Sequence, residues 1–188
     1  MSSRTRRSVV LVRHGQTALN AEGRLRGLAD PELTPTGIDQ AGETADALRS
    51  LAIARVISSP LLRAVTTAQI IADVTGAELA VDPAWTDRDY GPWTGHRTAD
   101  VVAQWGSVDD APDVEARTAV RERALRALTD LADSPSGTRI AVVTHDVIIR
   151  CLLDDIRPGL VPRVETGSWA ELVRTDDGWA VASVDNNG

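Results

Sequence analysis

The stretch Val9-Val10-Leu11-Val12-Arg13-His14-Gly15 decides the fold class of this chain. Its first four residues are aliphatic, and such a short, bounded apolar run is typical of a strand buried in a sheet. Arg13, His14 and Gly15 follow directly, so we expect them at the carboxyl end of that strand. In open α/β sheets, ligands bind at this edge. The stretch therefore predicts a functional site at the end of the first strand.

Two later segments repeat this arrangement. Residues 55–57 lead into Ser58-Ser59-Pro60 and then Arg63, and residues 140–143 lead into Thr144-His145-Asp146. Because parallel strands end at the same edge of a sheet, we expect two histidines and two arginines to converge on one pocket. Such a set suits an anion, and a phosphoryl group best, since the planar fork of arginine fits phosphate.

The rest of the chain alternates strand and helix signals, which predicts a three-layer α/β/α fold with a mixed, mostly parallel sheet. Thr34 and Pro35 begin a helix that runs toward Leu51, and Gly76 closes a helix that begins at Leu61. The other expected elements are helices over 99–105, 113–131 and 147–153, strands over 78–81 and 139–144, a turn over 134–138, and a hairpin of 168–174 and 179–184.

No internal repeat or low-complexity tract divides the chain, so we expect one domain over residues 1–188, with residues 1–7 as a mobile basic tail. The segment 82–97 is irregular and long for a connection, and such loops are often functional. We expect it to roof the site. Its Trp85, Tyr90 and Trp93 either wall an organic leaving group or pack in the core.

Composition limits the classes of partner. The chain has a net charge of -7, which argues against broad nucleic-acid binding, and no stretch is long and apolar enough to span a membrane. All 20 positively charged residues are arginines. Cys151 is the only cysteine, which excludes an internal disulfide; we expect it to pack in a helix, as fits a reducing cytoplasm. The edge of the terminal hairpin offers a surface for a homodimer.

The polar residues at the strand ends have expected chemical roles. A neutral imidazole at His14 can attack phosphorus, and neighbouring guanidinium groups keep it neutral. Arg13 and Arg63 would clamp the phosphoryl oxygens, and His145 would donate a hydrogen bond to one of them. Arg63 opposes the helix dipole on the first turn of its helix, a local conflict typical of functional sites. The chain has 3 histidines, none spaced as a zinc pair, so we expect no metal.

Three motifs carry a family resemblance. They are Leu11-Val12-Arg13-His14-Gly15-Gln16-Thr17 with Asn20, Ser58-Ser59-Pro60-Leu61-Leu62-Arg63-Ala64, and Val142-Val143-Thr144-His145. In this order and spacing they resemble the small phosphatase branch of the histidine phosphatase superfamily, also called the phosphoglycerate mutase-like family. The resemblance implies that fold, a phosphohistidine at His14, a pocket of Arg13, Arg63 and His145, a substrate contact from Asn20, and no metal or cofactor.

Two positions depart from the family pattern and leave the general acid open. Asp87 stands where this branch usually has glutamate, and its reach is shorter by about 1.5 Å. Asp146 follows the second histidine where this branch usually has glycine, and the acid phosphatase branch takes its proton donor from such an aspartate. Asp146 alternatively caps the helix that begins at Val147. Arg26 either contacts a second anionic group of the substrate or is a solvated loop residue.

The favoured function is metal-independent hydrolysis of a small phosphomonoester metabolite. One alternative is a phosphoglycerate mutase-type phosphotransferase, which must retain a bisphosphate and exclude water. The other alternative is a non-catalytic module that binds phosphoesters, since both acid candidates depart from the common pattern. The paired histidines and arginines argue against that module.

Overall fold

The computed structural model describes residues 7–132 and 137–187. Six strands form one sheet in the order β3-β2-β4-β1-β5-β6. Strands β1 (Ser8–Arg13), β2 (Arg55–Ser58), β3 (Glu78–Val81) and β4 (Arg139–Thr144) run parallel, whereas β5 (Trp169–Thr175) and β6 (Gly178–Asn186) form an antiparallel hairpin beside β1. The mixed, mostly parallel sheet and the terminal hairpin are confirmed.

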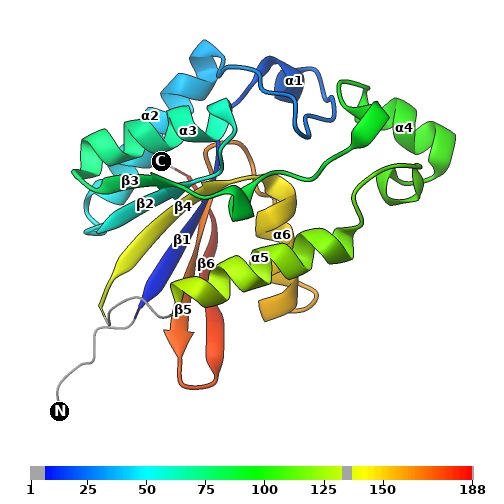
Figure 1. The fold of residues 1–188 in the computed structure, drawn as a ribbon. Helices are drawn as coiled ribbons and strands as arrows, with labels where there is room; N and C mark the ends of the chain where they lie inside the picture. Colours follow the sequence, from blue (N-terminus) through cyan, green and yellow to red (C-terminus); the bar gives the residue numbers. More distant parts are fainter. Residues whose placement is uncertain (1–6, 133–136, 188) are drawn as a thin grey trace.

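Helices cover both faces of the sheet, which gives the three layers that the alternation predicts (Figure 1). On one face lie α2 (Pro35–Arg49) and α3 (Leu62–Thr75), and on the other lie α5 (Arg117–Leu131) and α6 (Asp146–Ile156). Along β1, Val9 and Leu11 face the α5–α6 side, while Val10 and Val12 face the α2–α3 side. Because side chains of a strand point to opposite faces in turn, this alternation buries the aliphatic residues of β1 on both faces of the sheet.

Local signals set the helix ends as predicted. The Thr34 hydroxyl accepts from the backbone N–H of Gly37 at 3.1 Å, and Pro35 is the first residue of α2. Gly76 ends α3 with a φ of 72°, the left-handed region that glycine adopts without a steric cost. The buried faces of α2 and α5 hold apolar residues at helical spacing: Ala41, Ala45, Leu48, Val120, Ala124, Leu128 and Leu131.

Several element boundaries differ from prediction, most of them by only a few residues. Helix α5 begins at Arg117 rather than at residue 113. Residues 113–116 pair with the loop that carries Asp89, because the N–H of Glu115 donates to the Asp89 carbonyl at 2.8 Å. The short helix α1 (Ala18–Ala21) is not among the predicted elements, and it begins with a capping box of Thr17 and Asn20. Helix α6 begins at Asp146 and ends at Ile156, so it extends past the predicted range at both ends.

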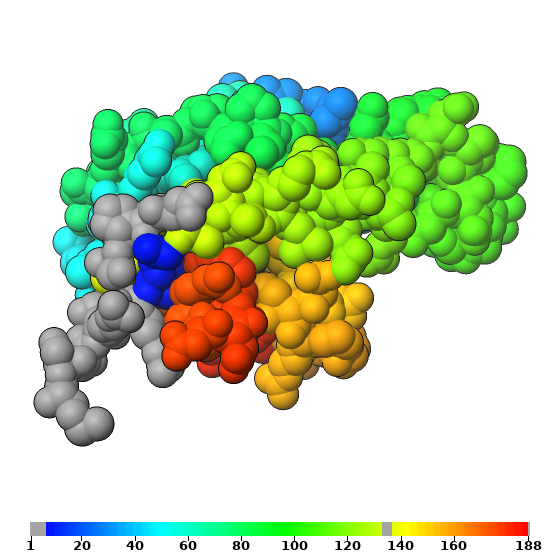
Figure 2. All heavy atoms as spheres, turned by 60° about the horizontal axis from the view of Figure 1, so that its bottom comes forward, coloured from blue at the N-terminus to red at the C-terminus, as the bar shows by residue number. Residues whose placement is uncertain are grey.

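The segment between β3 and α5 begins against the main core and then leaves the sheet and helix layers. It contains two 3-10 turns, Pro83–Trp85 and Gly91–Trp93, then α4 (Thr98–Trp105) and a third 3-10 turn, Val108–Asp110. Figures 1 and 2 show α4 and its neighbouring turns as a lobe at one end of the molecule, past the carboxyl edge of the sheet. Trp85 packs in the main core. Tyr90 and Trp93 pack in a small separate cluster.

The predicted mobile tail over residues 1–7 and the turn over 134–138 lie largely outside the described residues. Cys151 is buried on α6, as expected, and burial raises the pKa of its thiol. Among the helices of the described ranges, none is long and apolar enough to cross a membrane.

Candidate active site

The carboxyl ends of β1, β2 and β4 bring the predicted residues together. Arg13 is paired in register with Thr144, so the residues that follow them, His14 and His145, lie side by side. Their ring centroids are 5.2 Å apart. Both side chains are buried, with 1% exposure each. The convergence expected from the three strand ends is thus found in the structure.

The hydrogen bonds of His14 fix which of its nitrogens can attack. Nδ1 lies 2.7 Å from the Gly15 carbonyl, which only accepts, so Nδ1 carries the proton. Nε2 accepts from Nε of Arg63 at 3.2 Å and therefore has a lone pair. Burial lowers the pKa of His14 well below its usual value, and the neighbouring His145, Arg63 and Arg13 lower it further. These contacts and the lowered pKa favour a neutral His14 imidazole that carries its proton on Nδ1 and its lone pair on Nε2.

Arg63 is the centre of the site. It lies on the first turn of α3, as predicted, with 0% exposure. Its Nη2 donates to Oδ2 of Asp87 at 2.9 Å, and further N–H groups donate to the carbonyls of Gly27 and Ala29. These acceptors hold the guanidinium fork beside His14, where phosphoryl oxygens would lie. The conflict between Arg63 and the helix dipole is therefore balanced by contacts from a distant loop.

His145 is held by Ser59 and the loop that carries Asp87. Its Nε2 lies 2.7 Å from the Ser59 hydroxyl, and its Nδ1 lies 3.5 Å from Oδ2 of Asp87. Burial lowers the pKa of His145, and the charges of Arg63 and Arg26 lower it further. Ser59 belongs to the second motif but was not predicted as a site residue. Its position directly after a buried strand is the signal that would have identified it.

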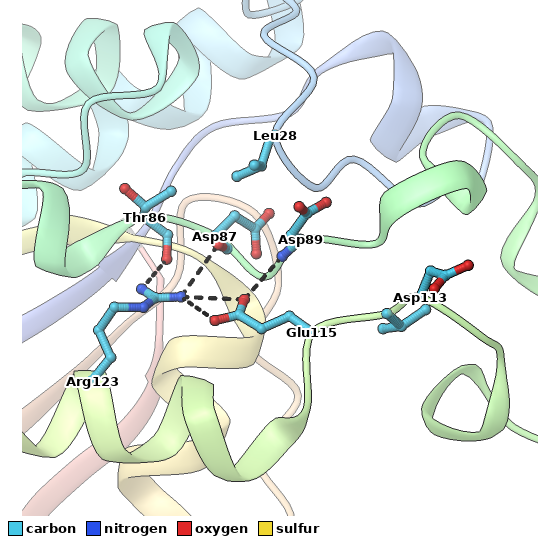
Figure 3. Close-up of a pocket in the computed structure, with 8 residues that line it drawn as sticks. Leu28, Thr86, Asp87, Asp89, Asp113, Glu115 and Arg123 are labelled. Atoms are coloured by element: carbon cyan, nitrogen blue, oxygen red, sulfur yellow. Dashed lines mark hydrogen bonds and ion pairs between the residues drawn. The ribbon is translucent and has the colours of Figure 1, made fainter.

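Asp87 lies inside the site despite its short side chain. It is 3% exposed, and its Oδ1 accepts from the backbone N–H of Arg88 at 2.8 Å while Oδ2 pairs with Arg63. Burial raises the pKa of Asp87, although the Arg63 charge opposes the rise. Asp87 also lines a cavity of about 570 Å³ with Leu28, Thr86, Asp89, Glu115 and others (Figure 3).

Arg123 of α5 holds the backbone that carries Asp87 (Figure 3). Its Nη1 donates to the carbonyls of Thr86 at 2.6 Å and Ala84 at 3.1 Å. Its Nη2 donates to the Asp87 carbonyl at 3.4 Å and pairs with Glu115 at 3.3 Å. Sequence reasoning missed this residue, because an arginine beside the apolar stripe of a helix has no local signal that separates it from a solvated one.

Arg13 and Asn20 each leave a buried donor unused. Nη1 of Arg13 donates to the Val164 carbonyl at 2.6 Å, and burial lowers the pKa of Arg13 to about 10. Oδ1 of Asn20 accepts from both the N–H and the hydroxyl of Thr17. Within the described residues, neither Nε of Arg13 nor Nδ2 of Asn20 has a hydrogen-bond partner. Buried donors of this kind are usually satisfied, so both are available to a ligand.

Asp146 and Arg26 lie at the margin of the site. Asp146 is paired with Arg150 on the next turn of α6. The prediction that Asp146 caps this helix is wrong: His145 occupies the cap position and Asp146 lies in the first turn, because the helix begins one residue earlier. Arg26 donates weakly to the Arg24 carbonyl at 3.3 Å, and it lines a second cavity together with Arg13 and Asp146.

Comparison with known proteins places this geometry in a family. The model of the histidine phosphatase superfamily (branch 1) matches residues 9–187. The chain belongs to this family. The probable phosphoglycerate mutase GpmB of Enterobacter sp. (strain 638) is 35% identical over 158 residues, which are 79% of this chain and 74% of that protein. The probable phosphoglycerate mutase GpmB of Salmonella arizonae is 34% identical over 158 residues, again 79% of this chain and 74% of that protein.

Solved structures share the fold over nearly the whole chain. One described as mycobacterial hydrolase 1 has a TM-score of 0.86 at 25% identity and covers 97% of this chain and 100% of its own. A mycobacterial glucosyl-3-phosphoglycerate phosphatase in complex with VO3 has a TM-score of 0.83 at 25% identity, covering 96% of this chain and 100% of its own. The chain is thus a histidine phosphatase with the phosphoglycerate mutase-like fold.

Within this histidine phosphatase the two aspartates occupy different environments. Asp87 touches Arg63 and lies near His145, so it is inside the group of residues that would surround a phosphoryl group. Asp146 is engaged by Arg150 and lines the neighbouring cavity. A proton donor must reach the leaving oxygen and hold a proton. Of the two aspartates, Asp87 is the one that lies among the residues converging at the strand ends.

Proposed function

We propose that the chain hydrolyses the phosphomonoester of a small metabolite through a phosphohistidine at His14. The observation that carries this proposal is the tautomer of His14, whose Nδ1 proton is bound by Gly15 while Nε2 keeps a lone pair toward Arg63. Nε2 attacks phosphorus, and the bond from phosphorus to the ester oxygen breaks. Arg13, Arg63, His145 and the free amide of Asn20 would hold the other phosphoryl oxygens.

Asp87 would protonate the leaving alcohol. A phosphoryl dianion that enters between Arg63 and His14 competes with Asp87 for the Arg63 fork. Negative charge beside a buried carboxyl favours its protonated form, so substrate binding itself would load Asp87 with the proton. After the alcohol leaves, Asp87 takes a proton from water as the water oxygen attacks phosphohistidine. Inorganic phosphate is released and the neutral His14 is restored.

A phosphotransferase remains the second candidate, because the relatives at 34% and 35% identity are named probable phosphoglycerate mutases. A mutase passes the phosphoryl group to a second substrate position and keeps water out. The cavity of about 570 Å³ beside Asp87 is open enough to admit water. We therefore favour hydrolysis. We also propose a cytoplasmic location with a small-molecule partner only.

The test is phosphate release from p-nitrophenyl phosphate and a panel of alkyl phosphomonoesters, in the presence of a chelator. The matched variants are His14→Ala, Asp87→Asn and Asp146→Asn. We expect activity to survive the chelator, to vanish in His14→Ala, and to fall more in Asp87→Asn than in Asp146→Asn. Phosphate transfer that appears only with a bisphosphate primer would instead establish a mutase. A folded protein that forms no phosphohistidine with any substrate would leave the non-catalytic binding module.

A further inference from the structure

The site contains a buried hydroxyl, that of Ser59, to which the proposed reaction gives no part. Ser59 is 0% exposed and directly follows the last residue of β2. Its Oγ lies 2.7 Å from Nε2 of His145, a shorter contact than either of those that Nδ1 of the same ring makes. Burial lowers the pKa of His145, which favours a neutral ring with a single N–H. The partners of the two ring nitrogens then decide which nitrogen carries the proton.

Ser59 is tied to β4, the strand that ends directly before His145. The backbone N–H of Ser59 donates to the Val143 carbonyl at 3.0 Å, and Val143 lies two residues before His145. The hydroxyl of Ser58 donates to the Ser59 carbonyl at 2.8 Å, which holds the other side of this residue. The Ser59 hydroxyl and the His145 ring therefore keep their positions relative to each other.

The guanidinium of Arg63 leaves no hydrogen for Nδ1 of His145. Nη2 of Arg63 has two hydrogens, and it donates to the Gly27 carbonyl and to Oδ2 of Asp87, each at 2.9 Å. Nδ1 of His145 lies 3.4 Å from this nitrogen, so a lone pair on Nδ1 would face a group whose hydrogens are already bound. A proton on Nδ1 would instead face an acceptor, Oδ2 of Asp87, at 3.5 Å. The surroundings of Nδ1 thus favour the protonated form of this nitrogen.

The surroundings of Nε2 lead to the same assignment. The Ser59 hydroxyl accepts from the backbone N–H of Leu61 at 3.4 Å. Within the described residues, Nε2 of His145 is the only acceptor to which this hydroxyl is hydrogen-bonded. A hydroxyl has one hydrogen to donate, so it is directed at the lone pair of Nε2. Each ring nitrogen thus has a suitable neighbour when the proton is on Nδ1.

We infer that Ser59 is a positioning residue, whose hydroxyl donates to Nε2 of His145 and keeps the ring proton on Nδ1 for an oxygen of the phosphoryl group. Nδ1 lies beside the same Arg63 fork that contacts Nε2 of His14, so the proton is on the side where phosphorus would be attacked. This inference rests on the proposed function, in which His145 donates to a phosphoryl oxygen. It explains how a histidine without a positive charge supplies that hydrogen bond.

The first measurement is the 15N spectrum of the histidine rings, recorded on the full chain with and without inorganic phosphate. Protonated and unprotonated ring nitrogens differ widely in 15N shift. The chain has 3 histidines, so spectra of His14→Ala and His96→Gln assign the signals of His145 by difference. We expect the proton on Nδ1 of His145 in the wild type in both states. In Ser59→Ala, Nε2 has lost its donor, so the ring should become a mixture of both tautomers.

The second measurement compares kcat for phosphate release and Kd for inorganic phosphate. Ser59→Ala should lower kcat about ten- to a hundredfold, the range expected when a hydrogen bond to a charged group is weakened, and should raise Kd. The loss of rate should be equal for an alkyl phosphate and for p-nitrophenyl phosphate, because a donor to phosphoryl oxygens acts whichever group leaves. Ser59→Thr keeps a hydroxyl and should retain both the tautomer and most of the rate.

Ser58→Ala is the matched control. The Ser58 hydroxyl is as buried as that of Ser59 and also makes a short hydrogen bond, but to a backbone carbonyl rather than to His145. We expect this variant to lose stability in urea titrations as Ser59→Ala does, and to keep the His145 tautomer and a kcat close to that of the wild type. An equal loss of kcat in both alanine variants would overturn the inference, because the effect would then come from packing.

The other outcomes separate this inference from the proposed function. A proton on Nε2 of His145 in the wild type would overturn the role of Ser59 and leave hydrolysis intact, and this spectrum decides even if Ser59→Ala does not fold. A Ser59→Ala variant that keeps the Nδ1 proton, or that loses rate on the alkyl phosphate alone, would also overturn it. The expected tautomers and weaker phosphate binding in Ser59→Ala, with no turnover of any ester by the wild type, would support the role of Ser59 and overturn hydrolysis.

Discussion

Replacing Arg123 by methionine should separate the positioning of the general acid from the rest of catalysis. The methionine side chain would keep much of the aliphatic stem but lose the donors to the carbonyls of Ala84, Thr86 and Asp87. The bond to Thr86, at 2.6 Å, is the shortest of these. Because aspartate is about 1.5 Å shorter than glutamate, Asp87 depends on this backbone being held close to the phosphoryl site.

The magnitude follows from the geometry. A bond from a charged donor contributes about 1.5–3 kcal/mol, and water replaces part of it because Arg123 is 22% exposed, so we expect a loss of about 2 kcal/mol in unfolding free energy. A displacement of about 1 Å at a reacting group costs on the order of a hundredfold in rate. We therefore expect kcat for an alkyl phosphate to fall about a hundredfold, within the range that a general acid supplies.

The assay measures kcat for an alkyl phosphate and for p-nitrophenyl phosphate in wild type, in Arg123→Met and in the control Arg126→Met. Arg126 lies on the same helix, and its side chain is 71% exposed. The nitrophenolate leaves without protonation, so its release should fall much less than release of the alkyl alcohol. Urea unfolding measured at the assay temperature confirms that each variant is folded. Equal losses on both substrates would refute the reasoning, because a general collapse of the site does not depend on the leaving group. No loss on either would show that Asp87 holds its position without Arg123.

Three further predictions concern stability. Gly37→Ala should lower the unfolding free energy by more than about 2 kcal/mol in urea titrations, because its Cβ would lie 2.1 Å from the Gln16 carbonyl, and retained stability would refute the close approach. Thr34→Ala should lower the free energy of unfolding by about 1 kcal/mol in the same titration, because the helix cap is lost. Thr34→Ser keeps the hydroxyl and should retain most of that free energy. The third is a pH dependence. The folded pKa values of His14 and His145 lie below the unfolded value of 6.5, so the unfolded chain binds more protons and the unfolding free energy should fall as pH drops below about 6.5. His145→Gln should reduce that slope, and an unchanged slope would contradict the buried neutral state.

Much of the fold could be predicted because its signals are local. The apolar run before Arg13 and the cap at Thr34 are each readable within a few residues, and each is found in the structure as expected. The convergence of His14, Arg63 and His145 also followed from sequence, since parallel strands share one carboxyl edge.

What could not be predicted depends on contacts between distant segments. The start of α5 is delayed by the bond from Glu115 to Asp89, which lies in another loop. The clamp from Arg123 to the Thr86 carbonyl joins residues 37 positions apart and uses a backbone acceptor, which every residue offers. Helix α6 begins one residue before the predicted start, so His145 takes the cap position and Asp146 lies in the first turn, although aspartate is among the residues preferred at caps.

The order of strands in the sheet has a consequence for biosynthesis. Of the six strands, β1 is synthesised before the others, yet its neighbours in the sheet, β4 and β5, follow only after β2 and β3. The backbone N–H of Arg13 donates to the Ser168 carbonyl, and its side chain donates to the Val164 carbonyl, so Arg13 is held in place only when that region has formed. A nascent chain therefore carries Arg13 and His14 long before the strands beside β1 have been made. Such long-range closure slows folding, because chain entropy is lost before the distant contacts form.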